Sequence, residues 1–140
     1  MDQIWNDSCD ILDLRLIVID PAEEIYMDGD AQKESPSVIY DSLRQLAHML
    51  EVPVLCTSHL HRNLERRKNK RPRLGDLKKI GVDPEWLDQI IFLYRDRYYD
   101  SEGEEGAELI VSKVVQGDVG TVRLNWEGAS KCFTERGEDE

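Results

Sequence analysis

The sequence of 140 residues contains no apolar run that approaches the roughly 20 residues a membrane-spanning helix needs. The first residues, Met-Asp-Gln-Ile-Trp, include no basic stretch and no apolar core, so we expect no secretory signal. Cysteine is scarce, and Cys9, Cys56 and Cys132 form an odd set at unrelated spacings. That pattern argues against a disulfide framework or a zinc site. These absences predict a cytoplasmic protein with reduced thiols and no membrane partner.

The sequence also lacks any Gly-x-x-x-x-Gly-Lys-Ser/Thr segment. Such a segment supplies the backbone amides and the lysine that hold nucleotide phosphates. We therefore expect the chain to neither bind nor hydrolyse ATP by itself.

Internal repeats and low-complexity segments are absent too. With 40% hydrophobic and 34% charged residues, the composition is typical of one soluble domain with a modest core.

Charge is distributed very unevenly along the chain, although the net charge is −11. Residues 62–79 hold nine of the 18 basic residues and only two acidic ones, which gives this basic segment a net charge of +7. Two interpretations remain open on charge alone. The segment contacts phosphates, as a basic stripe on an acidic body can, or it is a solvated loop.

The hydrophobic pattern predicts five strands and one long helix. Nearly continuous β-branched runs predict strands at residues 14–20, 54–57, 89–95, 108–114 and 121–126. The last two are joined by a Gly-Asp-Val-Gly turn typical of a hairpin. Ser35 and Pro36 predict a helix start with serine as the N-cap, and Ile39, Leu43, Leu46, Ala47 and Leu50 form its apolar face. A short helix is expected after Asp83, and loops at residues 21–35 and 98–106, with a polar tail at the end.

Several segments in order resemble the ATPase domain of DnaB-type replicative DNA helicases, from about residue 14 to residue 133. They are LRLIVID at 14–20, VPVL at 52–55, SHLHRNLERR at 58–67, Lys70-Arg71-Pro72, Asp76-Leu77, Gly81, FLYRD at 92–96, Tyr98-Tyr99 and GTVRL at 120–124. Each segment alone is weak, and the ordered set is specific. The resemblance implies an α/β fold of the RecA-like type: a partial mixed sheet flanked by helices, with a C-terminal β-hairpin. It predicts one domain, composed of an N-terminal segment 1–13, the helicase-like region 14–133 and an acidic tail 134–140.

The resemblance assigns nucleotide chemistry to three residues. Asp20 ends the strand that in this family carries the Mg²⁺-binding carboxylate, and Mg²⁺ is expected there only when nucleotide is bound. The alternative is that Asp20 only caps the end of the strand. His59 stands where the family has a glutamine that senses the γ-phosphate. Lys113 matches a lysine that contacts phosphate in a neighbouring subunit, whereas Val115 replaces the arginine finger. His59 and His61 as a metal pair lack a third ligand.

The resemblance also predicts contacts to single-stranded DNA. Lys78, Lys79 and Gly81 match positions that contact successive phosphates in the family, with lysine replacing the family's usual Arg-Glu pair. The preceding basic residues extend this surface: Arg66, Arg67, Lys70 and Arg71. No aromatic residue lies within 62–79, so we expect binding that is electrostatic and insensitive to sequence.

In the RecA-like core, the strand that bears the phosphate loop lies inside the sheet, between strands that this chain retains. Its absence leaves two strand edges unpaired. We therefore expect self-association or binding to DnaB-type helicase subunits, with single-stranded DNA as a candidate partner. Residues 1–13 are expected to cover part of the gap. Mg²⁺ and ATP are expected only if a second chain completes the site, as in a split ATPase. A non-functional gene remnant that still folds is the third alternative.

Overall fold

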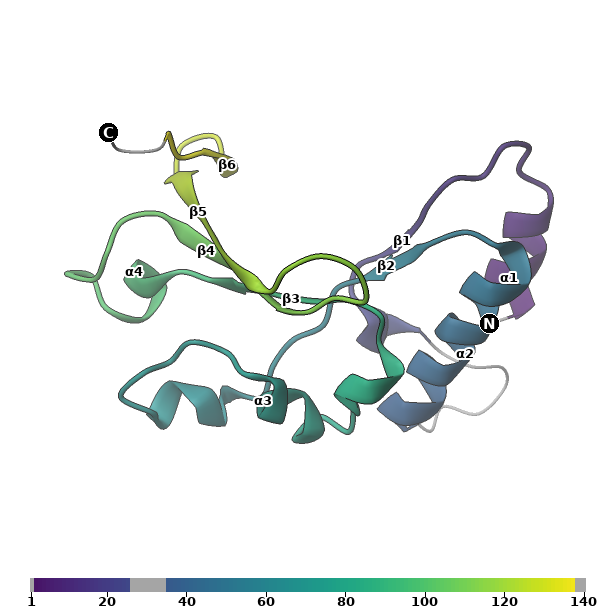
Figure 1. The fold of residues 1–140 in the computed structure, drawn as a ribbon, viewed down its shortest axis with the longest axis horizontal. Helices are drawn as coiled ribbons and strands as arrows, with labels where there is room; N and C mark the ends of the chain where they lie inside the picture. Colours follow the sequence, from purple (N-terminus) through teal and green to yellow (C-terminus); the bar gives the residue numbers. More distant parts are fainter. Residues whose placement is uncertain (1, 26–34, 138–140) are drawn as a thin grey trace. The chain divides into compact units, whose positions relative to one another are not determined.

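The computed structural model describes residues 2–25 and 35–137, which fall into two compact units (Figure 1). The first unit comprises residues 1–61 and 77–86, and the second comprises residues 62–76 and 87–140. The basic segment 62–79 is therefore divided between the two units. The predicted single domain stays a prediction, because compact units alone do not define a domain.

The first unit is built on two short parallel strands, β1 (Ile17–Ile19) and β2 (Val54–Cys56). Helix α2 (Pro36–Leu50) packs on one face of this pair. Ile39, Leu43 and Leu46 of the helix are buried, and alternate strand residues pack against them. The predicted strand 14–20 is thus confirmed in a shorter form. Parallel strands joined through a helix are the elementary unit of an α/β fold.

Helix α2 begins at Pro36, as predicted from the fixed φ of proline. Of its predicted apolar face, Ile39, Leu43 and Leu46 are buried, whereas buried Tyr40 was not predicted. It ends where Glu51 adopts a left-handed conformation with φ 52° and donates its backbone N–H to the carbonyls of Ala47 and His48. Ser35 occupies the predicted N-cap position, but the predicted capping hydrogen bond is wrong. The Ser35 hydroxyl makes no capping hydrogen bond and instead lies 2.7 Å from the Ser37 hydroxyl.

Helix α1 (Asp2–Cys9) packs Ile4 and Trp5 against the α2 core. The N-terminal segment therefore does contribute a short helix to the first unit. Ile11 and Leu12 belong to the N-terminal segment that we expected to cover part of the gap, and both are exposed.

The second unit contains an antiparallel sheet in the order β3-β4-β5-β6. Its strands are β3 (Ile90–Tyr94), β4 (Ala107–Lys113), β5 (Gly120–Glu127) and β6 (Cys132–Glu135). The predicted hairpin between β4 and β5 is confirmed. Strand β6 was missed because its short sequence has little hydrophobic pattern. It pairs with β5 through Trp126 opposite Phe133, whose rings lie 4.7 Å apart.

Short helical turns connect these elements. They are η1 (Ala22–Glu24), η2 (Arg62–Arg66), α3 (Leu74–Lys78), η3 (Pro84–Trp86) and α4 (Asp96–Tyr99). The turn after Asp83 was predicted. The predicted loop at 98–106 is wrong at its start, where α4 continues to Tyr99. The predicted loop at 21–35 contains η1, and its residues 26–34 lie outside the described part of the chain.

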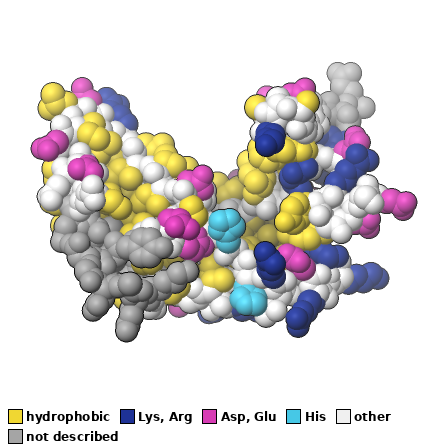
Figure 2. All heavy atoms as spheres, turned by 180° about the vertical axis from the view of Figure 1, so that it is seen from behind, with side chains coloured by type: hydrophobic (Ala, Val, Ile, Leu, Met, Phe, Trp, Pro, Cys, Tyr) yellow, Lys and Arg dark blue, Asp and Glu magenta, His cyan; other side chains and the backbone are white. Residues whose placement is uncertain are grey.

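The described strands form two separate sheets, and the outer strands of each, β1 and β2 in one and β3 and β6 in the other, are unpaired on one side. Strand β2 pairs only with β1, and strand β3 pairs only with β4, within the part of the chain that the structure describes. On the face opposite α2, Val18 and Leu55 are neighbours in register and are 58% and 53% exposed. Hydrophobic side chains reach the surface over both units in Figure 2. The expectation that a missing interior strand leaves two retained strands unpaired stays a prediction, because every open sheet has unpaired outer strands.

The structure contains no candidate membrane-spanning helix among its described residues.

Candidate functional site

A carboxylate and a hydroxyl meet at the carboxyl ends of β1 and β2. Asp20 follows β1 and Thr57 follows β2, and the Thr57 hydroxyl donates a hydrogen bond to the Asp20 carboxylate. The backbone fixes this placement, because Thr57 N–H donates to the Ile19 carbonyl at 3.0 Å and Ala22 N–H donates to the Thr57 carbonyl at 2.9 Å. Asp20 therefore lies at an edge that suits a ligand, with its carboxylate exposed and oriented by a neighbouring strand.

Glu23 is a second carboxylate at this edge that our sequence reasoning missed. Its Oε1 accepts hydrogen bonds from the Ser58 hydroxyl at 2.6 Å and from the His59 backbone N–H at 2.8 Å. Partial burial raises the pKa of Glu23, but these hydrogen bonds, the Glu23 backbone amide and the charge of His59 outweigh it. The pKa of Glu23 therefore lies below its ordinary value, and Glu23 is anionic at neutral pH. No sequence signal marked Glu23, because its partners are 35 and 36 positions away in the chain.

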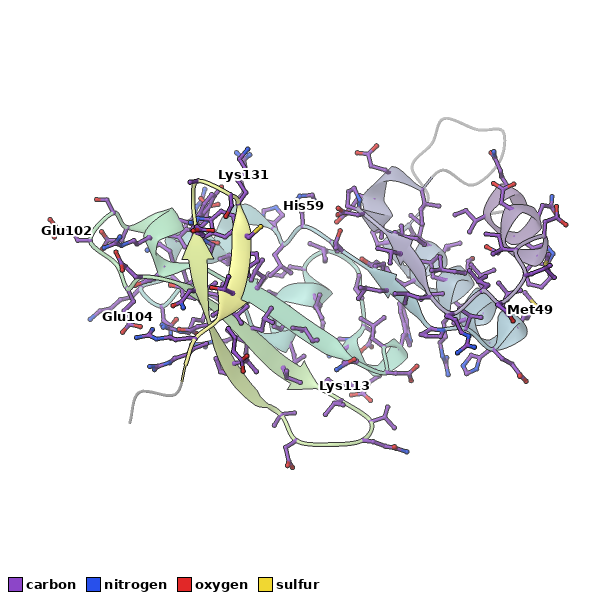
Figure 3. The ribbon with its side chains drawn as sticks, turned by 90° about the horizontal axis from the view of Figure 1, so that it is seen from above. Met49, His59, Glu102, Glu104, Lys113 and Lys131 are labelled. Carbon is purple, nitrogen blue, oxygen red and sulfur yellow. The ribbon has the colours of Figure 1, made fainter. Side chains whose placement is uncertain are left out.

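His59, the predicted sensor, lies on the loop after β2 with its side chain largely exposed (Figure 3). Its Nδ1 is 3.8 Å from Glu23 Oε2. This position beside the carboxylate edge is compatible with a sensor, and the sensor role stays a prediction. Among the described residues no group of three His, Cys, Asp or Glu side chains could hold a metal ion, so His59 and His61 gain no third ligand.

Tyr40 of α2 lies buried beneath this edge. Burial raises the pKa of Tyr40 to about 12, against the opposing effect of a hydrogen bond with Ser58. Burial and the charge of Glu23 likewise raise the pKa of the Cys56 thiol. Tyr40 and Cys56 are therefore neutral at physiological pH. The oxygen ligands at this edge thus lie next to uncharged side chains.

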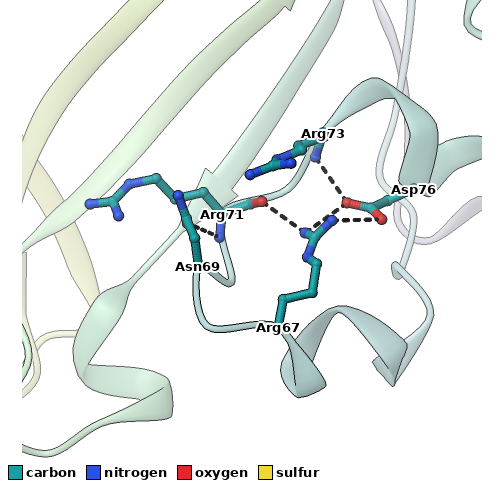
Figure 4. A network of polar contacts seen from close by, with 5 residues as sticks. All are labelled: Arg67, Asn69, Arg71, Arg73 and Asp76. Atoms are coloured by element: carbon teal, nitrogen blue, oxygen red, sulfur yellow. Dashed lines mark hydrogen bonds and ion pairs between the residues drawn. The ribbon is translucent and has the colours of Figure 1, made fainter.

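In the basic segment, Arg67 is held by a buried carboxylate (Figure 4). Its guanidinium donates to both oxygens of Asp76, at 3.1 and 2.9 Å, and to the Arg71 carbonyl at 2.9 Å. Asp76 also accepts the Arg73 backbone N–H at 3.0 Å. We call these contacts the Arg67–Asp76 clamp. The clamp closes the loop between η2 and α3, so both terminal nitrogens of the Arg67 guanidinium are already engaged.

Arg71 is also engaged within the second unit. Its Nε and Nη donate to the two carboxylate oxygens of Glu108 on β4, at 2.8 and 2.6 Å, and its guanidinium lies 4.8 Å from the centre of the Tyr94 ring. The hydrogen bonds to Glu108 hold the pKa of Arg71 above its ordinary value. The DNA contacts predicted for Arg67 and Arg71 stay predictions, but both side chains already have strong partners.

The other predicted DNA residues are more accessible. Lys78 and Lys79 are exposed at the end of α3. Gly81 follows with φ 80°, a conformation that glycine adopts without strain, and donates its N–H to the Lys78 carbonyl at 3.2 Å. Arg66 is exposed and Lys70 is half-buried. Figure 2 shows Lys and Arg side chains gathered over the second unit.

Lys113, the predicted phosphate contact, ends strand β4 and is half-buried (Figure 3). Val115 follows it in the exposed turn between β4 and β5. An aliphatic side chain at that position cannot stabilise negative charge on a phosphoryl group. The role of Lys113 stays a prediction.

The chain matches a family of helicase domains over nearly its whole length. A model of the DnaB-like helicase C terminal domain matches residues 7–135. The chain belongs to the DnaB-like helicase C-terminal domain family. The resemblance found in the sequence and the α/β fold of the RecA-like type are therefore confirmed.

Two curated relatives are replicative DNA helicases of bacteria. The chain is 41% identical to DnaB of Geobacillus stearothermophilus and 39% identical to DnaC of Bacillus subtilis, each over 116 residues that make up 79% of this chain. The chain spans only 26% of the length of either protein.

Two solved structures share the fold. A solved ATPase domain matches with a TM-score of 0.85 and 32% identity, covering 96% of this chain and 51% of that one. A DnaB-like replicative helicase, described together with its interactions with primase, matches with a TM-score of 0.82 and 33% identity, covering 96% of this chain and 35% of that one.

Proposed function

We propose that this chain is a non-catalytic DnaB-type module that binds helicase subunits, or a second copy of itself, together with single-stranded DNA. ATP-driven unwinding of DNA during replication, in the cytoplasm, is the activity we assign to the assembly it joins. The observation that carries this proposal is the pair of sheets with unpaired edges and bare apolar faces. A module that needs a neighbour to complete its sheets would leave them in this state.

The partner is tested by mass. We expect light scattering to give a larger complex when the chain is mixed with a full-length DnaB-type helicase than either component gives alone. Two separate species, each with the mass of a free component, would contradict the helicase-binding half of the proposal. Bovine serum albumin in place of the helicase controls for non-specific adhesion.

Nucleotide binding requires more than the edge supplies. The Asp20 carboxylate and the Thr57 hydroxyl are hard oxygen ligands of the kind Mg²⁺ takes. The sequence contains no Gly-x-x-x-x-Gly-Lys-Ser/Thr segment to hold the phosphates, and Val115 stands at the finger position. Mg²⁺ and ATP therefore bind at Asp20 only when a second chain brings the phosphate loop.

The chain alone should show no ATP binding at micromolar concentrations and no ATPase activity above buffer. The reason is that metal ligands without a phosphate cradle leave the charge of the triphosphate uncompensated. Fluorescence anisotropy with a labelled ATP analogue and a phosphate-release assay measure the two quantities. Micromolar binding that Asp20→Ala abolishes would show that the chain forms a nucleotide site unaided.

A split ATPase is the second candidate, and the preformed contact between Asp20 and Thr57 favours it. Adding a polypeptide that carries the phosphate loop should then restore hydrolysis. Asp20→Ala should remove the restored activity, whereas Asp10→Ala, at an exposed acidic position outside the edge, should not.

Single-stranded DNA should bind weakly and with a steep dependence on salt. Each neutralised phosphate contributes roughly 0.7 to the log–log salt slope, so two or three contacts give a slope of about −1.4 to −2.1. Replacing both Lys78 and Lys79 with alanine should flatten the slope by about 1.4, with affinity in the weak range of about 10⁻⁴ to 10⁻⁶ M.

Titrations of a labelled oligonucleotide at several salt concentrations measure this slope. Lys131→Ala is the matched control, because it removes an exposed lysine at the turn between β5 and β6 (Figure 3). An unchanged slope in the Lys78→Ala, Lys79→Ala double variant would mean that these lysines only face solvent.

A further inference from the structure

An open pocket in the second unit combines tyrosine rings with basic side chains. Its volume is about 470 Å³, and it is lined by Arg62, Glu65, Lys70, Tyr98 and Tyr99. This volume lies within the range of small-ligand sites. The basic segment contains no aromatic residue, yet the fold brings two tyrosines from later in the chain to its side.

The tyrosines form a supported platform. Tyr98 is 72% exposed, and its ring packs nearly perpendicular to that of Tyr99, with 5.0 Å between centroids and an interplanar angle of 87°. Tyr99 in turn stacks on buried Tyr94 at 5.9 Å and 19°. Arg71 lies over the Tyr94 ring. Tyr98 is therefore an exposed ring supported by the packed rings of Tyr99 and Tyr94. Its side chain loses little conformational freedom when a planar ligand stacks on it.

The positive charge of the pocket is available. Within the described part of the chain, no hydrogen bond or ion pair joins the side chains of Arg62 or Lys70 to another residue, in contrast to Arg67 and Arg71. Lys70 does interact electrostatically with the Asp96 carboxyl, although without a direct ion pair. A guanidinium and an ammonium without such partners can bind a phosphate at low desolvation cost. Glu65 repels a phosphate on its own side, and its carboxylate can accept a hydrogen bond from a base N–H.

We propose that this pocket binds one nucleotide of a single strand, with its base stacked on Tyr98 and its phosphate held by Arg62 and Lys70. The inference rests on the proposed binding of single-stranded DNA and deepens it. It changes one expectation drawn from the sequence, because binding then has a stacking component as well as an electrostatic one. Stacking on an aromatic ring tolerates any base, so sequence preference remains small.

Tyr98→Leu in the full chain is the direct test, because leucine keeps an apolar side chain and removes the ring. We expect affinity for a fluorescein-labelled oligo(dT) of about 12 nucleotides to fall by about fivefold or more, in line with measured stacking contributions. The salt slope should not change. Tyr98→Phe should bind like the parent, because the hydroxyl is not needed for stacking. Lys70→Ala should instead lower the slope by about 0.7.

Photocrosslinking locates the contact. An oligonucleotide that carries 5-bromodeoxyuridine should crosslink to Tyr98, as mapped by mass spectrometry, and Tyr98→Leu should remove that crosslink. Thymidine 5′-monophosphate as competitor distinguishes the two sources of this chemistry. If the crosslink is lost when the mononucleotide is present at the same nucleotide concentration as the oligonucleotide, a free mononucleotide is the preferred ligand and the assignment to a strand is overturned. Retention of the crosslink supports the strand.

The results separate this inference from the proposed function. The pocket would be overturned if Tyr98→Leu bound with the affinity of the parent and the parent gave no crosslink at Tyr98. If the salt slope of the parent still depended on Lys78 and Lys79, the proposed function would stand. Absence of any oligonucleotide binding by the parent chain at low salt would overturn both.

Discussion

Replacing Asp76 with alanine should lower the free energy of unfolding of the chain by about 3 kcal/mol. Asp76 is 3% exposed and receives two hydrogen bonds from Arg67 and one from the Arg73 backbone. Its loss leaves a partly buried guanidinium and a backbone N–H without their acceptor. Because the Arg67 side chain is 27% exposed, water compensates in part, which places the effect at the low end of the range for buried pairs.

Urea denaturation followed by circular dichroism measures this change. Lys68→Ala removes an exposed charge from the same loop and should change stability by less than about 0.5 kcal/mol. A double-mutant cycle of Arg67→Ala with Asp76→Ala should give a coupling of more than about 1 kcal/mol. A loss below about 1 kcal/mol in Asp76→Ala would mean that the Arg67–Asp76 clamp does not hold the loop.

Hydrophobic patterning was enough to locate most of the framework. The strand at 90–94 and the helix from Pro36 follow from β-branched runs and from the i, i+4 spacing of Ile39 and Leu43. These signals are local in sequence, so they survive without any knowledge of the fold. The order of motifs then identified the family, because several weak local matches in one order are specific together.

The candidate site was less predictable, because its partners are distant in sequence. Glu23 is oriented by Ser58 and His59, and Arg71 is paired with Glu108 on a strand 37 positions later. A count of basic residues treats Arg67 and Lys70 alike, although one is clamped by Asp76 and the other lines a pocket. Tertiary contacts decide which charges remain available, and no local pattern encodes them.

The missing capping bond of Ser35 and the unexpected strand β6 have local causes. A serine before proline suits a helix start, but its hydroxyl can bond to a neighbouring hydroxyl in place of the backbone. Strand β6 is short and exposed along its length, so it shows no alternation of polar and apolar residues. Its pairing with β5 supplies the reason for its conformation.

The open sheet of the second unit supports a prediction about association. Leu93 on β3, Leu109 on β4 and Val122 on β5 are direct neighbours across three strands and share one face. Leu93 is 51% and Val122 52% exposed, so this apolar face is bare in the isolated chain. We expect sedimentation at tens of micromolar to show species larger than the monomer, because burying such a face is favourable.

Leu93→Lys should weaken this association by about 100-fold, because an unpaired ammonium in an apolar contact costs several kcal/mol and each 1.4 kcal/mol changes affinity about tenfold. Its stability as a monomer should change little, since half of the side chain already faces solvent. Leu12→Lys is the matched control, with the same change at an exposed residue outside both sheets. If Leu12→Lys weakens association as much, net charge and not the sheet face drives it. A parent chain that sediments as a stable monomer, without binding a dye for apolar surface, would show instead that the two sheets are complete as they stand.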